Sequence, residues 1–163
     1  MIINTTLQYA SEAAAGTGMV INASGLVLTN NHVIYHATKI TATVASTGRT
    51  FTATVLGYDK SGDIALLQLR NASRLKTVPV GNSSSVKTGI PVVALGNAEG
   101  QGTITATPGR VTALGQTITA SEDGGSTDSE TLHGMIQTNA DIVPGDSGPG
   151  SARPGSARPA ACT

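Results

Sequence analysis

Aromatic residues, charged residues and cysteines are all scarce in this 163-residue sequence. Tryptophan is absent, phenylalanine occurs once and tyrosine three times, so valine, isoleucine, leucine and alanine must form the hydrophobic core. Cys162 is the single cysteine, which excludes an intrachain disulfide bond but leaves the cellular compartment open. Only 12% of residues are charged, and ten Lys and Arg balance ten Asp and Glu, so no net field attracts nucleic acid.

Long apolar runs and an export signal are also missing. No stretch of 18 or more apolar residues occurs, so we expect no segment of this chain to span a membrane. The start, Met1 to Thr5, has no basic region followed by an apolar one, so we expect no signal peptide in this chain. We also expect neither a metal ion nor a cofactor.

Short apolar segments with period-two alternation, separated by turns, run through most of the chain. Residues 17–22 and 26–29 flank Ala23-Ser24-Gly25, which predicts a hairpin. Residues 39–44 alternate, and residues 64–69 are almost continuously apolar, as in a buried strand. Apart from a single turn around residues 31–34, no segment keeps a helical period. The sequence therefore predicts an all-β protein, either a sandwich or two barrels in tandem.

Composition divides the chain into three parts. Residues 78–86, rich in glycine, asparagine and serine, indicate a connection, so we place one domain at residues 1–81 and another at 82–148. Residues 149–163 repeat Gly-Ser-Ala-Arg-Pro, and no valine, isoleucine or leucine follows Val143. Because proline lacks the N–H group that a β-ladder needs, we expect this tail to be disordered and to supply no core strand.

Three segments place a histidine, an aspartate and a serine where a hydrolase would need them. His32 follows one predicted strand, Asp63 precedes another, and Ser147 lies in Pro144-Gly145-Asp146-Ser147-Gly148. A serine hydroxyl becomes a strong nucleophile only when an adjacent base removes its proton, and imidazole suits that role near neutral pH. The aspartate would fix the histidine tautomer. These residues are the candidate catalytic triad.

The glycine before the serine suggests a second catalytic element. Gly145 allows unusual backbone dihedral angles, so the N–H groups of Gly145 and Ser147 can converge on a developing oxyanion. Plainer roles exist for each residue: His32 as a surface or core histidine, and Asp63 and Ser147 as turn residues. Asp59 is a nearby alternative to Asp63, and no motif supports the remaining histidines, His36 and His133.

Together these motifs resemble the trypsin-like serine proteases of the HtrA/DegP type, and more narrowly their secreted actinobacterial members. The resemblance covers the chain from about Thr17 to Gly148. It rests on four segments in order, Gly16-Thr17-Gly18, residues 27–33, residues 63–67 and residues 144–148. It implies the chymotrypsin fold, with two tandem six-stranded β-barrels, of which the first carries His32 and Asp63 and the second carries Ser147.

The resemblance also implies a function and partners. Such proteases cleave unfolded or exposed polypeptide outside the cytoplasm without ATP, often as homotrimers and often with a peptide-binding PDZ module, which we do not expect within this sequence. Asp141 lies six residues before Ser147, the offset at which trypsin carries the carboxylate that binds Lys or Arg. HtrA-type relatives usually have a small residue there, so we favour the alternative that Asp141 faces solvent without a role.

The chain departs from the family after the serine. There the family continues with Gly-Gly-Pro and apolar strands that complete the second barrel, whereas here Gly148-Pro149-Gly150 leads into the repeats. We expect an incomplete second barrel and interpret the tail as a frame-shifted or chimeric end. The alternative to an active endopeptidase is therefore a catalytically defective or merely peptide-binding remnant. A non-enzymatic adhesion sandwich would require the three motifs to coincide by chance.

Overall fold

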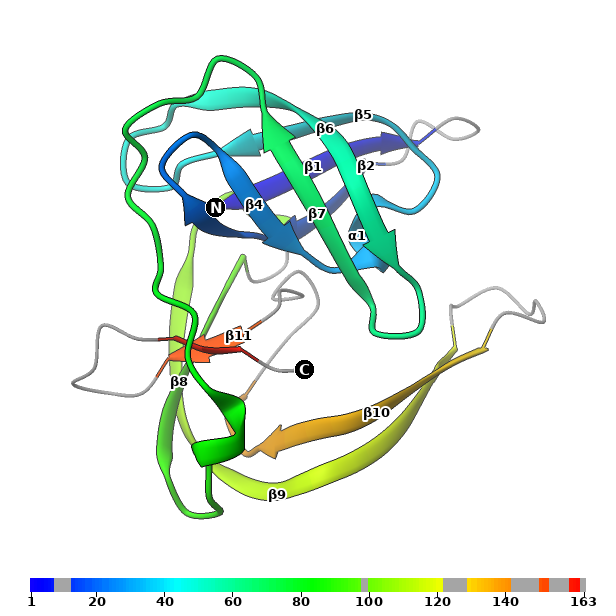
Figure 1. The fold of residues 1–163 in the computed structure, drawn as a ribbon, viewed down its shortest axis with the longest axis vertical. Coiled ribbons are helices and arrows are strands. Elements are labelled where there is room, and N and C mark those ends of the chain that lie inside the picture. The colour runs from blue at the N-terminus through cyan, green and yellow to red at the C-terminus, as the bar shows by residue number, and fades with distance from the viewer. Residues whose placement is uncertain (8–12, 98–99, 122–128, 142–149, 153–158, 162–163) are drawn as a thin grey trace.

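The computed structural model describes residues 1–7, 13–97, 100–121, 129–141, 150–152 and 159–161 (Figure 1). These residues form strands almost throughout, with one four-residue helix, α1 (Asn31–Ile34), and one short 3-10 helix, η1 (Ser83–Ser85). The prediction of an all-β protein is confirmed. None of the helices in the described ranges is long and apolar enough to cross a membrane.

The first half of the chain forms one antiparallel sheet of seven strands, in the order β2-β1-β5-β6-β7-β4-β3. Its strands are β1 (Ile2–Leu7), β2 (Ala13–Thr17), β3 (Met19–Asn22), β4 (Leu26–Thr29), β5 (Ala37–Thr43), β6 (Thr50–Asp59) and β7 (Ile64–Leu69). β2 and β3 stand at opposite ends of this order, yet only Gly18 separates them in the chain. The sheet therefore curls into a nearly closed barrel, seen in the upper half of Figure 1.

Gly18 makes this closure possible. Its N–H donates to the carbonyl of Met1 at 2.9 Å, and its own carbonyl accepts from the amino group of Met1 at 2.6 Å. A β-carbon at this position would lie 2.8 Å from Cγ1 of Val27, closer than two such atoms can pack. A glycine is therefore required where the chain passes from one end of the sheet to the other.

The core of the barrel follows from the alternation seen in the sequence. Along β7 every second side chain is buried, and Ala65 and Leu67 have no exposed surface. Val27 of β4 and Ile3 of β1 are equally buried. Because successive side chains of a strand point to opposite faces, one face of each strand fills the barrel and the other faces outward. Twelve buried residues share this core.

The second half forms a five-stranded antiparallel sheet, in the order β10-β9-β8-β11-β12. Its strands are β8 (Pro91–Gly96), β9 (Thr105–Ser121), β10 (Ser129–Thr138), β11 (Gly150–Ala152) and β12 (Pro159–Ala161). β9 pairs with β8 through residues 105–110 and with β10 from Val111 onward, and it curves along the bottom of Figure 1. Among the described residues, only Val86, Val92 and Val111 form its buried cluster, against which Ile136 packs.

The predicted domain boundary at residues 81 and 82 lies within the connection from β7 to β8. The domain limits and the number of barrels stay predictions. The tail contains two three-residue strands where the sequence indicated disorder, and Ser151 and Ala152 of β11 pair with Ala94 and Val93 of β8. Ladder hydrogen bonds join backbone groups, so an open edge of β8 can pair even with a segment of small residues.

Candidate active site

The register of two strands brings His32 and Asp63 together. His32 belongs to α1, which begins two residues after β4, while Asp63 directly precedes β7. β4 and β7 are antiparallel, with Thr29 opposite Ala65. The chain that leaves β4 therefore passes beside the chain that enters β7. A separation of 31 residues in sequence becomes a direct contact.

The side chains of His32 and Asp63 form a short polar contact. Nδ1 of His32 lies 2.7 Å from Oδ2 of Asp63, and the backbone N–H of His32 donates to Oδ1 at 2.9 Å. The aspartate side chain is 7% exposed and the histidine side chain 43%. The carboxylate is therefore shielded from water, while the imidazole is partly open to solvent.

Asn30 is a third member of this group, and the sequence reasoning did not single it out. Its Nδ2 donates to Oδ2 of Asp63 at 3.0 Å and to the backbone carbonyl of Asp63 at 2.9 Å. Asp63 has a φ of 48°, in the left-handed region that non-glycine residues seldom adopt. The only signal in the sequence was the position of Asn30 within the histidine motif, two residues before His32.

Asp59, the alternative aspartate, has different partners. Its Oδ1 accepts hydrogen bonds from the backbone N–H and the hydroxyl of Ser61, at 2.9 and 2.7 Å. The hydroxyl bond is the largest cause of an Asp59 pKa below its ordinary value. The carboxylate is fully exposed and shapes the turn between β6 and β7. Asp63 is the aspartate that contacts His32.

The other predicted site residues lie apart from this pair or outside the described ranges. Ser147 and Gly145 lie outside the described residues. Asp141 is described and exposed, and its role stays a prediction. His133, on β10, has its Nδ1 3.1 Å from the hydroxyl of Thr117. Within the described ranges, no group of His, Cys, Asp and Glu side chains is arranged to hold a metal ion.

A chain of buried hydrogen bonds connects the two sheets next to this pair. The hydroxyl of Thr17, at the end of β2, accepts from the backbone N–H of Asn97 at 2.9 Å. The carbonyl of Thr17 accepts from the hydroxyl of Thr29 at 2.9 Å. Asn97 and Thr29 have no exposed surface, and Thr17 is 6% exposed. Because Thr29 directly precedes Asn30, this chain links the end of β8 to the segment that carries His32.

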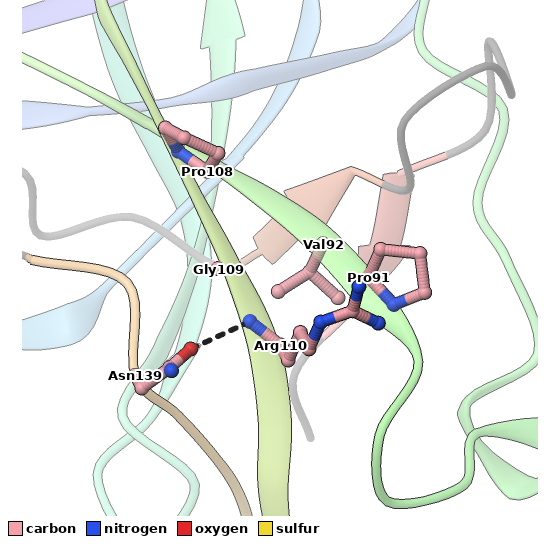
Figure 2. Close-up of a pocket in the computed structure, with 6 residues that line it drawn as sticks. All are labelled: Pro91, Val92, Pro108, Gly109, Arg110 and Asn139. Carbon is pink, nitrogen blue, oxygen red and sulfur yellow. Dashed lines mark hydrogen bonds between the residues drawn. The ribbon is translucent and has the colours of Figure 1, made fainter.

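An open pocket of about 360 Å³ lies beside the second sheet, and Figure 2 shows the residues that line it. The residues that line it are Pro91, Val92, Pro108, Gly109, Arg110 and Asn139. The backbone N–H of Arg110 donates to Oδ1 of Asn139 at 2.7 Å, and its guanidinium donates to the carbonyl of Gly89 at 3.0 Å. This lining contains no nucleophile and no group that titrates near neutral pH.

Comparison with known proteins defines the class. Residues 16–150 match the family described as trypsin-like peptidase domain. The chain therefore belongs to the trypsin-like peptidase family. The resemblance to HtrA/DegP-type proteases, inferred from the ordered motifs, is confirmed.

Individual relatives make the comparison more specific. The chain is 44% identical over 134 residues to the periplasmic pH-dependent serine endoprotease DegQ of Escherichia coli K12, covering 82% of this chain and 27% of that protein. It is 38% identical over 157 residues to the serine protease PepD of Mycobacterium tuberculosis, covering 91% and 32%. This chain spans about a third or less of the length of these curated relatives.

Solved structures agree with the sequence comparison. The HtrA-type protease AlgW, solved with a tripeptide, superposes with a TM-score of 0.76 at 31% identity, covering 93% of this chain and 46% of that one. The active form of the Rv3671c protease from M. tuberculosis gives a TM-score of 0.77 at 30% identity, covering 93% and 63%. The fold is thus that of HtrA-type proteases.

Proposed function

We propose that this chain carries the catalytic centre of a serine endopeptidase, with His32, Asp63 and Ser147 as its triad. The observation that carries the proposal is the 2.7 Å contact between Nδ1 of His32 and the buried carboxylate of Asp63. Such a contact keeps the proton on Nδ1, and Nε2 is then the basic nitrogen. The family match and the serine protease names of the relatives support the same reaction.

The reaction follows from these roles. Nε2 of His32 takes the hydroxyl proton of Ser147 while Oγ attacks the carbonyl carbon of the scissile peptide bond. The N–H groups of Gly145 and Ser147 stabilise the oxyanion, and the carbonyl re-forms as the C–N bond breaks. The proton passes from Nε2 to the leaving amine. Water then hydrolyses the acyl-enzyme in the same way, and Asp63 stabilises the imidazolium in both steps.

The proposed substrates are unfolded or exposed polypeptides outside the cytoplasm. Support comes from relatives such as DegQ, whose name places it in the periplasm. A homotrimer, which the resemblance implies, stays a prediction. We include in the proposal that Asp141 plays no part in specificity, because its side chain is exposed on the surface.

A second candidate function, a catalytically defective remnant, is favoured by one observation. The buried cluster described in the second half has three residues, against twelve in the barrel, and Leu95, Leu114 and Ile118 remain 42, 39 and 45% exposed. The serine motif belongs to this half of the chain. Displacing a catalytic nucleophile by about 1 Å can lower the reaction rate by about 10²-fold.

A fluorophosphonate probe distinguishes the two candidates, because it labels only an activated serine. For an endopeptidase we expect stoichiometric labelling that Ser147→Ala abolishes and that His32→Ala slows strongly. Asp59→Asn is the matched control and should label at the normal rate. Absence of labelling in the folded wild-type chain would identify the defective remnant, and labelling that survives Ser147→Ala would refute the proposed nucleophile.

A further inference from the structure

Among the described residues, the groups that contact the Asp63 carboxylate belong to one short segment, Asn30 to His32. Oδ1 accepts from the backbone N–H of His32, and Oδ2 lies 2.7 Å from His32 Nδ1 and accepts from Nδ2 of Asn30 at 3.0 Å. A buried carboxylate depends on such donors, since an ionised group without them is strongly destabilised. Two of these contacts come from His32 itself. Within the part of the chain that the structure describes, Asn30 therefore contributes a side-chain donor that is independent of the histidine.

The amide of Asn30 also controls the backbone that carries this carboxylate. The same Nδ2 donates to the Asp63 carbonyl at 2.9 Å, so one group bridges the main chain and the side chain of Asp63. This residue has a φ of 48°, a conformation that persists only when its surroundings stabilise it. The bridge fixes the direction of the carboxylate relative to the backbone.

Helix capping does not explain Asn30. The residue occupies the N-cap position of α1, where asparagine usually accepts a hydrogen bond from the first turn. Here its side chain makes no capping hydrogen bond and turns to Asp63 instead. The helix is thus left without a side-chain cap, while the aspartate gains a donor.

We propose that Asn30 is a positioning residue, which holds the Asp63 carboxylate in the orientation that His32 requires. The kinetic consequence of this inference, a slower chemical step, rests on the proposed function. Its structural consequence, the orientation of the Asp63 carboxylate, does not. Without the amide, the Asp63 side chain can rotate away from Nδ1, and His32 then loses its fixed tautomer. The consequence is a lower rate of the chemical step with little change in substrate binding.

The test uses two substitutions that preserve the start of the helix. Serine and aspartate are both favoured N-cap residues, so Asn30→Ser and Asn30→Asp should leave α1 in place. Neither residue retains the amide donor. Aspartate has the same shape as asparagine but places a second carboxylate beside Asp63. Asn82→Ala is the matched control, because Oδ1 of Asn82 accepts from the N–H of Ser84 at 3.0 Å in η1, in the connection between the sheets.

The first readout is the Nδ1 proton of His32, observed by NMR in the whole chain carrying Ser147→Ala. With Asn30 present we expect a low-field signal protected from exchange with water. The exchange rate of this proton with water should rise by about 10- to 100-fold in Asn30→Ser, which is the range expected for losing one hydrogen bond to a charged group. It should rise further in Asn30→Asp. Asn82→Ala should leave the signal unchanged.

The second readout is kinetic. We expect kcat, or the maximal rate of probe labelling, to fall by about the same 10- to 100-fold in Asn30→Ser while KM stays nearly constant. An unchanged His32 signal and an unchanged rate in both Asn30 variants would overturn the proposal. If the wild-type chain neither cleaves peptides nor reacts with the probe, but the signal still depends on Asn30, the positioning role holds and the proposed function fails.

Discussion

Asp63 combines an unusual backbone conformation with a specific set of donors. Its positive φ lets the carboxylate turn toward His32 while the next residue enters β7. Aspartate tolerates this conformation better than most residues, because its short side chain can hydrogen-bond locally. The residue thus serves both the turn and the contact with the histidine.

Replacing Asp63 with asparagine tests its role at nearly constant size. An amide in place of the carboxylate favours the wrong histidine tautomer, so we expect the rate of probe labelling or peptide cleavage to fall by about 10⁴-fold. Asp59→Asn should change the rate less than about twofold, because Asp59 hydrogen-bonds to Ser61. Parallel rate measurements on the two variants check this. A near-normal rate in the Asp63 variant would refute the triad.

Asp59 gives a pH-dependent contribution to stability. Hydrogen bonds from Ser61 lower the pKa of Asp59 from its ordinary value of 3.8. The contribution is therefore fully present above the unfolded-state pKa and is lost as the pH falls through the lower folded-state pKa. In Ser61→Ala we expect the pKa of Asp59 to rise toward 3.8. An NMR titration of the carboxylate, with urea unfolding at about pH 6 and about pH 2, checks the sign.

The difference in unfolding free energy between wild type and Ser61→Ala should shrink at the lower pH, because protonation of Asp59 removes the stabilisation that the Ser61 hydroxyl gives to the carboxylate. A difference that grows as the pH falls would show that the hydroxyl of Ser61 stabilises the turn by another route.

At the scale of elements, the ends of β2, β4 and β8 meet at Thr17. Its hydroxyl and carbonyl accept hydrogen bonds from Asn97 and Thr29 respectively, and these three residues are buried. The contact with Asn97 spans 80 positions in the sequence and ties the second sheet to the barrel. The hydroxyl of Thr17 is therefore one of the contacts that hold the two sheets together.

Thr17→Val removes this hydroxyl with little change in volume. The buried N–H of Asn97 then loses its acceptor, so we expect a loss of about 1–3 kcal/mol in the free energy of unfolding. Thr17→Ser keeps the acceptor and should lose less. Thr38→Val is the matched control, since the Thr38 hydroxyl bonds to the carbonyl of Thr6 on the surface. Urea unfolding of the three variants tests the prediction, and equal stabilities would contradict it.

At the scale of the whole molecule, the two sheets differ in how much apolar surface they bury. The barrel encloses a cluster of Leu67, Leu69 and ten further buried residues, whereas the buried cluster described in the second half consists of three valines, with Leu132 and Ala140 buried outside it. Leu95, Leu114 and Ile118 of β8 and β9 remain 42, 39 and 45% exposed. Because burial of apolar surface is the main stabilising contribution, the second sheet should open more easily.

Native-state hydrogen exchange measures this difference directly. We expect the amides of β4 and β7 to exchange only through global unfolding, and those of β9 and β10 to exchange through local opening at lower free energy. Leu67→Ala should cost about 2–5 kcal/mol in global stability, as a buried leucine commonly does. Strong and uniform protection in both sheets would show that the smaller core suffices.

The sequence by itself determined the fold class, the family and the two motifs that supply His32 and Asp63. Period-two alternation is local, so the strands on either side of Gly25 could be predicted without knowing their partners. The tail was harder to predict, because the pairing of β11 with β8 depends on an open edge and not on the composition of residues 150–152.

Only the tertiary structure decided which residues surround the histidine. The context of residues 63–67 favoured Asp63 over Asp59, and the register of β4 against β7 places the Asp63 carboxylate beside His32. The same register places the amide of Asn30 against Asp63, and the closure of the barrel at Gly18 places Thr17 between Thr29 and Asn97. Such contacts depend on how distant strands pair, so no local pattern in the sequence encodes them.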